Sequence, residues 1–205
     1  LVDVKKRKLV GESAVGKRLS GLISIPGSSF LAAVDEEDNE LILLEKVGFQ
    51  IKTRARSMVA HSPVSLTASG DGRHLAVVSL WARRVSLFAM DAKGKSFQRI
   101  KVTDLPFPPC FQWMDGPGRR LVVADAFSDQ IAALSLPDLR LVAVRSLPGH
   151  NVGGITRSHD GNDLLFSHQT INHRVPTIKP RVFWGAVIQN GLAGLSLEDL
   201  FDPLP

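Results

Sequence analysis

A spacing of about 45 residues runs through the whole chain and limits the folds that it can adopt. Four segments share one plan, in which a turn rich in Gly, Asp or Pro precedes a leucine that opens a short apolar run. These leucines are Leu31, Leu75, Leu121 and Leu164, which lie 44, 46 and 43 residues apart. A fixed period of this length is typical of proteins built from repeated structural units.

Each repeat contains about four short strand patterns. A second apolar run begins ten residues after the leucine, at Leu41, Val85 and Ile131 in the first three repeats. Further short runs precede each turn and close each unit. Four strands in about 45 residues make one β-propeller blade, and stacked blades bury their apolar faces against each other. A β-sandwich also suits short strands with frequent turns, but it has no reason to repeat at this period.

The sequence therefore predicts an all-β protein, a β-propeller of four-stranded antiparallel blades. Residues 1–15 are expected to hold the outer strand of a preceding blade, and the repeats are expected at about 16–60, 61–106, 107–150 and 151–205. Four blades can close a propeller, but the interpretation that we favour is a truncated part of a larger ring.

The fourth repeat is longer than the others. The motif LSLPDL at 134–139 begins 13 residues after its strand leucine, whereas LSLEDL at 195–200 begins 31 residues after its own. Eighteen extra residues therefore lie between the second and third strands, at about 168–190. Insertions in repeat proteins map to loops on one face, often the binding face.

Blade topology places the link into the fourth repeat, PGHNVGG at 148–154, at the same end as the insertion. We expect this end to form a ligand or partner face, with the Asp-Gly turns at the opposite end. The candidate residues are His150, Asn151, His168, His173, Arg174, Trp184 and Asn190. A loop histidine usually caps or hydrogen-bonds, and histidines form a ligand set only where their nitrogens converge. Both interpretations stay open, with no catalytic and no metal-binding residue identified.

The string GESAVGKR at 11–18 has the letters of a phosphate-binding loop but not its context. Such a loop needs a Ser or Thr hydroxyl for magnesium after the lysine, followed by a helix. Arg18 stands at the hydroxyl position, and Pro26-Gly27 would end any helix within two turns. We therefore predict no nucleotide binding. The acidic run at 35–38 is expected to be a solvated loop.

Composition excludes several other classes. The net charge is +5, but the basic residues are scattered and aromatic residues make up only 6%, so the stacking surfaces of a nucleic-acid site are not expected. No apolar run approaches the roughly 20 residues of a transmembrane helix. Cys110 is the only cysteine, which excludes an internal disulfide and a Cys-x-x-Cys-His haem attachment site.

Two resemblances refine this prediction. The strings VGKRLSGLISIPGSSFLAAVD, SGDGRHLAVV and SHDGNDLLFS resemble the YVTN-type (WD-repeat-like) bacterial β-propeller repeat. The strings DEEDNELILLE, LPGHNVGGI and FWGAVIQNGLAGLSLEDL are similar to propeller domains of exported proteins that carry a c-type cytochrome or a di-haem peroxidase-like domain. The resemblance implies a periplasmic or extracellular location and an adjacent domain or protein, such as a c-type cytochrome, as partner. Because this chain lacks the attachment motif, no cofactor is expected in it, and any haem would belong to a missing domain.

Two hypotheses for function follow. The first is a non-catalytic β-propeller scaffold that presents one loop face to a partner domain, protein or ligand. The alternative is the propeller part of a c-type haem oxidoreductase, in electron transfer or peroxidase-like chemistry, whose haem domain lies outside this chain. In both, this chain alone is not expected to be an enzyme.

Overall fold

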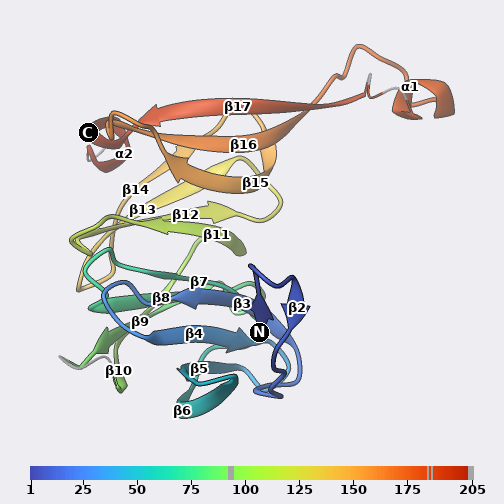
Figure 1. Ribbon diagram of the computed structural model, residues 1–205. Helices are drawn as coiled ribbons and strands as arrows, with labels where there is room; N and C mark the ends of the chain where they lie inside the picture. Colours follow the sequence, from blue (N-terminus) through green and yellow to red (C-terminus); the bar gives the residue numbers. More distant parts are fainter. Residues whose placement is uncertain (92–94, 184, 186, 203–205) are drawn as a thin grey trace.

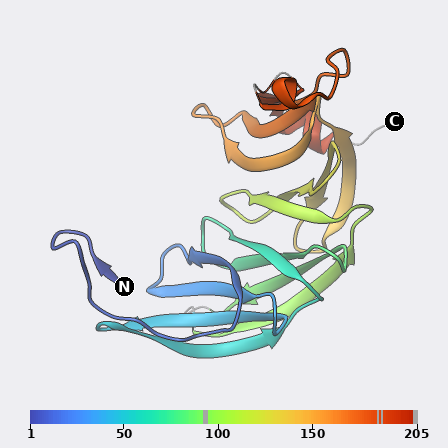
Figure 2. The same ribbon diagram turned by 90° about the vertical axis from the view of Figure 1, so that its right-hand side faces the viewer.

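Antiparallel β-sheets stacked face to face along an arc make up the structure, a computed structural model that describes residues 1–91, 95–183, 185 and 187–202 (Figures 1 and 2). The prediction of an all-β propeller built from four-stranded antiparallel blades is confirmed. Within the described ranges, no helix is long and apolar enough to cross a membrane.

Successive strands of each sheet are neighbours in the chain, as in an up-and-down blade. The first sheet contains β3 (Leu19–Ser24), β4 (Phe30–Asp35), β5 (Glu40–Val47) and β6 (Gln50–Met58). The second contains β7 (Pro63–Ala68), β8 (His74–Ser79), β9 (Arg84–Met90) and β10 (Phe97–Asp104). The third contains β11 (Pro109–Met114), β12 (Arg120–Asp125), β13 (Gln130–Ser135) and β14 (Arg140–Ser146).

The fourth sheet has three strands in the described part of the chain: β15 (His150–Arg157), β16 (Asp163–Ile171) and β17 (Ile188–Ser196). A short helix, α1 (Lys179–Phe183), lies in the connection between β16 and β17. A second, α2 (Leu197–Phe201), directly follows β17, and its Ser196 N-cap accepts hydrogen bonds from the backbone N–H groups of Glu198 and Asp199.

Equivalent glycines form the turns between the first and second strands of all four sheets. Gly27, Gly72, Gly118 and Gly161 have φ angles of +71°, +69°, +67° and +80°. Glycine has no Cβ and adopts this left-handed conformation without the steric cost that other residues bear. The Pro-Gly and Asp-Gly pairs of the repeat are therefore a requirement of the turn geometry.

Apolar side chains fill the space between each pair of neighbouring sheets. Along β8, Leu75 and Val77 face the first sheet, while Ala76 and Val78 face the third, and all four are fully buried. Since both faces of an inner sheet are covered, its strands read as continuous apolar runs and not as an alternation. A third cluster, which includes Phe166, joins the third sheet to the fourth.

The N-terminal segment differs from the prediction for residues 1–15. It forms a small hairpin of β1 (Val2–Asp3) and β2 (Lys8–Leu9), which pair with each other. Residues 10–15 then run over the outer face of the first sheet, where Val15 packs against Ala33, Ile42 and Leu44. This segment therefore covers part of an apolar sheet face at one end of the arc.

The extra residues of the fourth repeat have two structural roles. Part of them lengthens the hairpin of β16 and β17, which pair over nine residues each, from Asp163 opposite Ser196 to Ile171 opposite Ile188. The described residues of 172–187, here called the arm, form the connection and include α1. Figure 1 shows the arm extending beyond the stack of sheets.

Candidate partner-binding rim

Two ends of the sheet stack differ in their connections. One end, here called the turn end, carries the glycine turns. The other, the link end, carries the links between sheets and the connections from second to third strands. His150 begins β15 at the link end and pairs with Gln169, two residues before β16 ends and the arm begins. The arm and the link into the fourth sheet therefore emerge side by side.

A polar residue four positions after each repeat leucine is buried at the link end. These residues are Asp35, Ser79, Asp125 and His168. The Ser79 hydroxyl donates to the carbonyl of Ala60, 2.9 Å away, in the link before its sheet. Asp125 accepts backbone N–H groups of its own turn. The position therefore fastens the link-end connections in the first three sheets.

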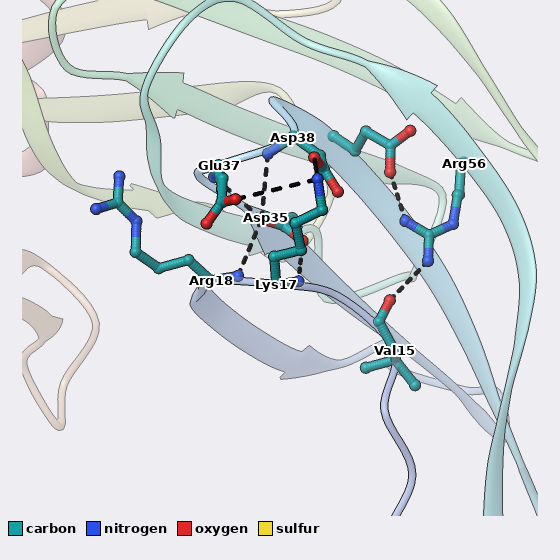
Figure 3. A network of polar contacts seen from close by, with 8 residues as sticks. Val15, Lys17, Arg18, Asp35, Glu37, Asp38 and Arg56 are labelled. Carbon is teal, nitrogen blue, oxygen red and sulfur yellow. Dashed lines mark hydrogen bonds and ion pairs between the residues drawn. The ribbon is translucent and has the colours of Figure 1, made fainter.

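Asp35 is the most highly connected of these residues (Figure 3). Its carboxylate accepts the backbone N–H groups of Lys17 at 2.6 Å and Arg18 at 3.2 Å, and those of Glu37 and Asp38 at 3.0 and 3.3 Å. Burial opposes ionisation, but the four N–H groups together outweigh it and hold the pKa of Asp35 below its usual value. The expectation of a solvated loop was wrong for Asp35, which is fully buried.

The same contacts explain the string GESAVGKR. The backbone N–H groups of Lys17 and Arg18 donate to a carboxylate of the chain itself, and the segment leads into strand β3 and not into a helix. The Lys17 ammonium lies 2.6 Å from the Asp38 carboxylate. In this chain, the string therefore anchors the link into the first sheet.

His168 departs from the other three residues at this position. Its side chain is buried between Gly149 and Gly191, so closely that a methyl group added at Gly149 would overlap the Nδ1 atom. Nδ1 is buried and has no hydrogen-bond partner within the described structure. Buried polar atoms are nearly always satisfied. In the described structure, the other buried side-chain atoms without a partner belong to His74, Ser86, Gln112 and Arg145.

A ladder of side-chain amides crosses the three strands of the fourth sheet. The Asn151 amide donates to Oε1 of Gln169 at 3.1 Å, and the Gln169 amide donates to Oδ1 of Asn190 at 3.3 Å. The two asparagines belong to the predicted candidate set, whereas Gln169 was missed because its role depends on strand register. We call these residues, with His150 and His168, the fourth-sheet rim.

The remaining candidate residues lie in or near the arm. His173 and Arg174 follow β16 and are exposed, and the backbone N–H of Arg174 donates to Oδ1 of Asn172. Trp184 lies outside the described residues. His168 is buried and His173 is exposed, so the two side chains lie in different environments. Over the described ranges, no group of three His, Cys, Asp or Glu side chains could hold a metal ion.

At the turn end, the Asp side chains form hydrogen bonds within their own turns. Ser158 donates to Asp160 at 2.6 Å, and this hydrogen bond is the main cause of the lowered pKa of that carboxyl. A hollow of about 570 Å³ lies there between the first two sheets, lined in part by Asp71 and Arg73. The Asp71 carboxylate already accepts the Ser69 hydroxyl and the Arg73 backbone N–H. His74 also lines the hollow, and its buried Nδ1 has no hydrogen-bond partner in the described structure. We place the candidate site at the link end because the insertion and a ladder of side-chain amides lie there.

An exposed aromatic pair adds to the link end. Trp81, after β8, stacks on Phe127, after β12, with ring centroids 5.8 Å apart and planes inclined by 24°. The side chains are 61% and 55% exposed. Exposed aromatic residues are enriched in protein interfaces, so the pair extends the candidate surface from the fourth sheet toward the second and third.

Solved structures share this fold. A chain of Kuenenia stuttgartiensis hydrazine synthase matches with a TM-score of 0.78 and 18% identity, over 97% of this chain and 56% of that one. A putative 6-phosphogluconolactonase from Bacteroides uniformis matches with a TM-score of 0.65 and 11% identity, over 87% and 55%. The periplasmic gluconolactonase of Pseudomonas aeruginosa matches with a TM-score of 0.62 and 20% identity, over 72% and 46%.

These similarities establish a propeller-like fold. The chain spans about half the length of the solved chains that it matches. No family model matches the sequence, and no curated protein matches it. Because one fold hosts many functions, the role of this chain has to be argued from its own surface.

Proposed function

We propose that this chain is a non-catalytic β-propeller scaffold that binds a partner protein or domain through its fourth-sheet rim. The observation that carries the proposal is the amide ladder of Asn151, Gln169 and Asn190. Three amides held in register across three strands present fixed donors and acceptors near the exposed arm. Fixed polar groups of this kind orient a bound partner at little entropic cost.

Two finer features belong to the same proposal. The repeat sequences favour the YVTN-type propeller group, and an exported protein is the origin that this resemblance implies. A solved neighbour of similar fold is named a periplasmic gluconolactonase, which is compatible with that location. The repeats and the shared fold support these assignments, and both are proposals.

Site-specific photo-crosslinking tests the proposed rim. A photo-reactive amino acid is placed at Asn151 or Asn190 on the rim, and at Asn162 at the turn end as a matched control. In cells that express the protein, we expect the rim positions to yield a discrete crosslinked partner and the control position to yield none. Equal crosslinking from both ends, or none from the rim, would refute the proposal.

The second candidate function is the propeller part of a c-type haem oxidoreductase whose haem domain lies outside this chain. It is favoured by the buried, unpartnered Nδ1 of His168 and by the fold shared with an enzyme, hydrazine synthase. A titration of a purified c-type cytochrome with this protein tests it. A change in the Soret absorption that disappears in His150→Ala supports this function, and an unchanged spectrum argues against it.

A further inference from the structure

A hollow of about 500 Å³, here called the arginine cleft, lies between the first and second sheets and is lined in part by Arg84 and Arg99. Both sheets have four strands within the described residues. One wall is formed by Val59 and Ala60, which follow β6, and the other wall is formed by β9 and β10. A cleft of this size can hold a small molecule.

Strand register places three hydrogen-bond donors in a row along the second-sheet wall. Arg84 and Ser86 are two residues apart on β9, so they share one face of the sheet, and both line the cleft. Arg99 on β10 also lines it and lies opposite Phe88, two residues beyond Ser86. Ser86 therefore lies midway between the two arginines, about 7 Å along the strand direction from the level of each.

The Ser86 hydroxyl is a buried group without a partner. Ser86 is 1% exposed, and its Oγ has no hydrogen bond within the described structure. Strand register puts Ile42 and Ala132 at the equivalent positions of the first and third sheets, and both are fully buried. Because an apolar residue satisfies the packing at this position, the buried hydroxyl needs another explanation.

The two arginines keep most of their donors available. Arg99 reaches across the cleft to the first sheet, where its Nη1 donates to the carbonyl of Met58 at 3.2 Å. The Nε of Arg84 donates to the Asp104 carboxylate at 2.7 Å. A guanidinium carries five N–H donors, and within the described structure neither side chain forms another hydrogen bond. Free N–H groups therefore lie on both sides of the Ser86 hydroxyl.

We propose that the arginine cleft binds a small organic carboxylate. Guanidinium N–H groups pair with the two oxygens of a carboxylate, and the Ser86 hydroxyl donates to the same group. Arginine side chains are long enough to reach a group bound at the midpoint between them. The apolar side chains of Val59 and Val102 also line the cleft, and they contact the hydrocarbon part of the ligand.

The charge of the lining favours a carboxylate over a phosphate or a sugar. Two guanidiniums and the Asp104 carboxylate line the cleft, so one further carboxylate balances their charge. A phosphate group carries up to two negative charges, and Asp104 would oppose the second. An uncharged sugar would use the Ser86 hydroxyl but would leave the positive charge without a complement.

An NMR titration of the isotopically labelled chain with sodium hexanoate tests the ligand class. We expect saturable shifts at the backbone amides of β9 and β10, with a dissociation constant on the order of 1 mM. Hexanol, which lacks the carboxylate, and inorganic phosphate are expected to bind at least about tenfold more weakly. Absence of saturable shifts with hexanoate, or tighter binding of phosphate or hexanol, would overturn the proposal.

A charge-removing variant with a matched control tests the arginines. Arg99→Gln is expected to weaken hexanoate binding by at least about tenfold, because hydrogen bonds to charged groups are the stronger ones. Lys101→Gln removes the same charge from the same strand, but Lys101 lies opposite Leu87, whose side chain packs toward the third sheet. We expect this control to bind as the wild type does. Equal losses in the two variants, or none in Arg99→Gln, would contradict the proposed site.

Replacing Ser86 with alanine tests the hydroxyl separately from folding. Ser86→Ala is expected to weaken hexanoate binding by about threefold or more. Its melting temperature should equal or exceed that of the wild type, because the change removes a buried hydroxyl that has no partner and introduces the residue found at position 132 of the third sheet. Unchanged binding, or a lower melting temperature that reveals a partner within the protein, would overturn the role of Ser86.

Discussion

Replacing Asp35 with alanine tests whether the polar residue at the link end fastens the first sheet. Asp35 is fully buried and accepts four backbone N–H groups. A buried donor left without an acceptor costs about 1–3 kcal/mol, and water can reach some of these donors because Lys17 and Glu37 are exposed. We therefore expect Asp35→Ala to lower the free energy of unfolding by about 3 kcal/mol, or the melting temperature by about 6–12 °C for a chain of this size.

The assay is thermal and urea unfolding followed by circular dichroism, with Asp38→Ala as the matched control. Asp38 also lies in this turn, but its contact with Lys17 is exposed, and exposed ion pairs contribute little to stability. We expect the control to melt within error of the wild type. Equal losses in the two variants, or no loss in Asp35→Ala, would refute the idea that the buried carboxylate holds the link.

The same residue predicts a pH dependence. The pKa of Asp35 in the folded protein lies below its ordinary value of 3.8. A lowered folded-state pKa contributes stability that is complete well above the unfolded-state value and is lost as the pH falls through the folded one. The stability difference between the wild type and Asp35→Ala should therefore be full at neutral pH and shrink below about pH 4. A difference that grows on acidification would contradict the assignment.

Three further predictions follow from contacts described above. Calorimetric titration should detect no ATP or GTP binding to the wild type or to Lys17→Ala, and micromolar binding that disappears in the variant would contradict the interpretation of GESAVGKR. Gly149→Ala should destabilise the fourth sheet by about 1–3 kcal/mol, because the added methyl overlaps Nδ1 of His168. Urea unfolding measures this loss. The control is Gly116→Ala, where the added methyl would meet open space. Burial raises the pKa of the Cys110 thiol to about 11, so iodoacetamide should alkylate the native protein far more slowly at pH 8 than the unfolded chain, and equal rates would refute this.

The repeat period predicted the stacking of the sheets because it reflects packing that recurs in every unit. Each turn glycine and each strand leucine occupies the same structural position in its sheet. The same pattern of residues therefore occurs in all four repeats of the sequence. The departure of the fourth repeat could also be located, since an insertion breaks the period. Its placement beside His150 followed from strand direction alone.

The details of the candidate rim could not be predicted from the sequence. The role of Gln169 depends on which residues lie opposite it on two other strands, and register is not visible in a single segment. The acidic run at 35–38 looks uniform in sequence, yet the repeat position buries Asp35 and leaves Glu37 exposed. The stack of Trp81 on Phe127 joins two repeats, and nothing in either one alone indicates it.

The stacking of sheets face to face makes the chain resemble a row of coupled units, in which each unit depends on its neighbours. Within the described residues, the second and third sheets have apolar clusters on both faces, whereas the fourth shares one such cluster, with the third. Amide hydrogen exchange should therefore be slowest in β8 and β12 and fastest in β17, where opening disrupts one interface and not two. A protein that binds β17 or the fourth-sheet rim would stabilise the fourth sheet. Its binding free energy would therefore include the free energy of ordering that sheet.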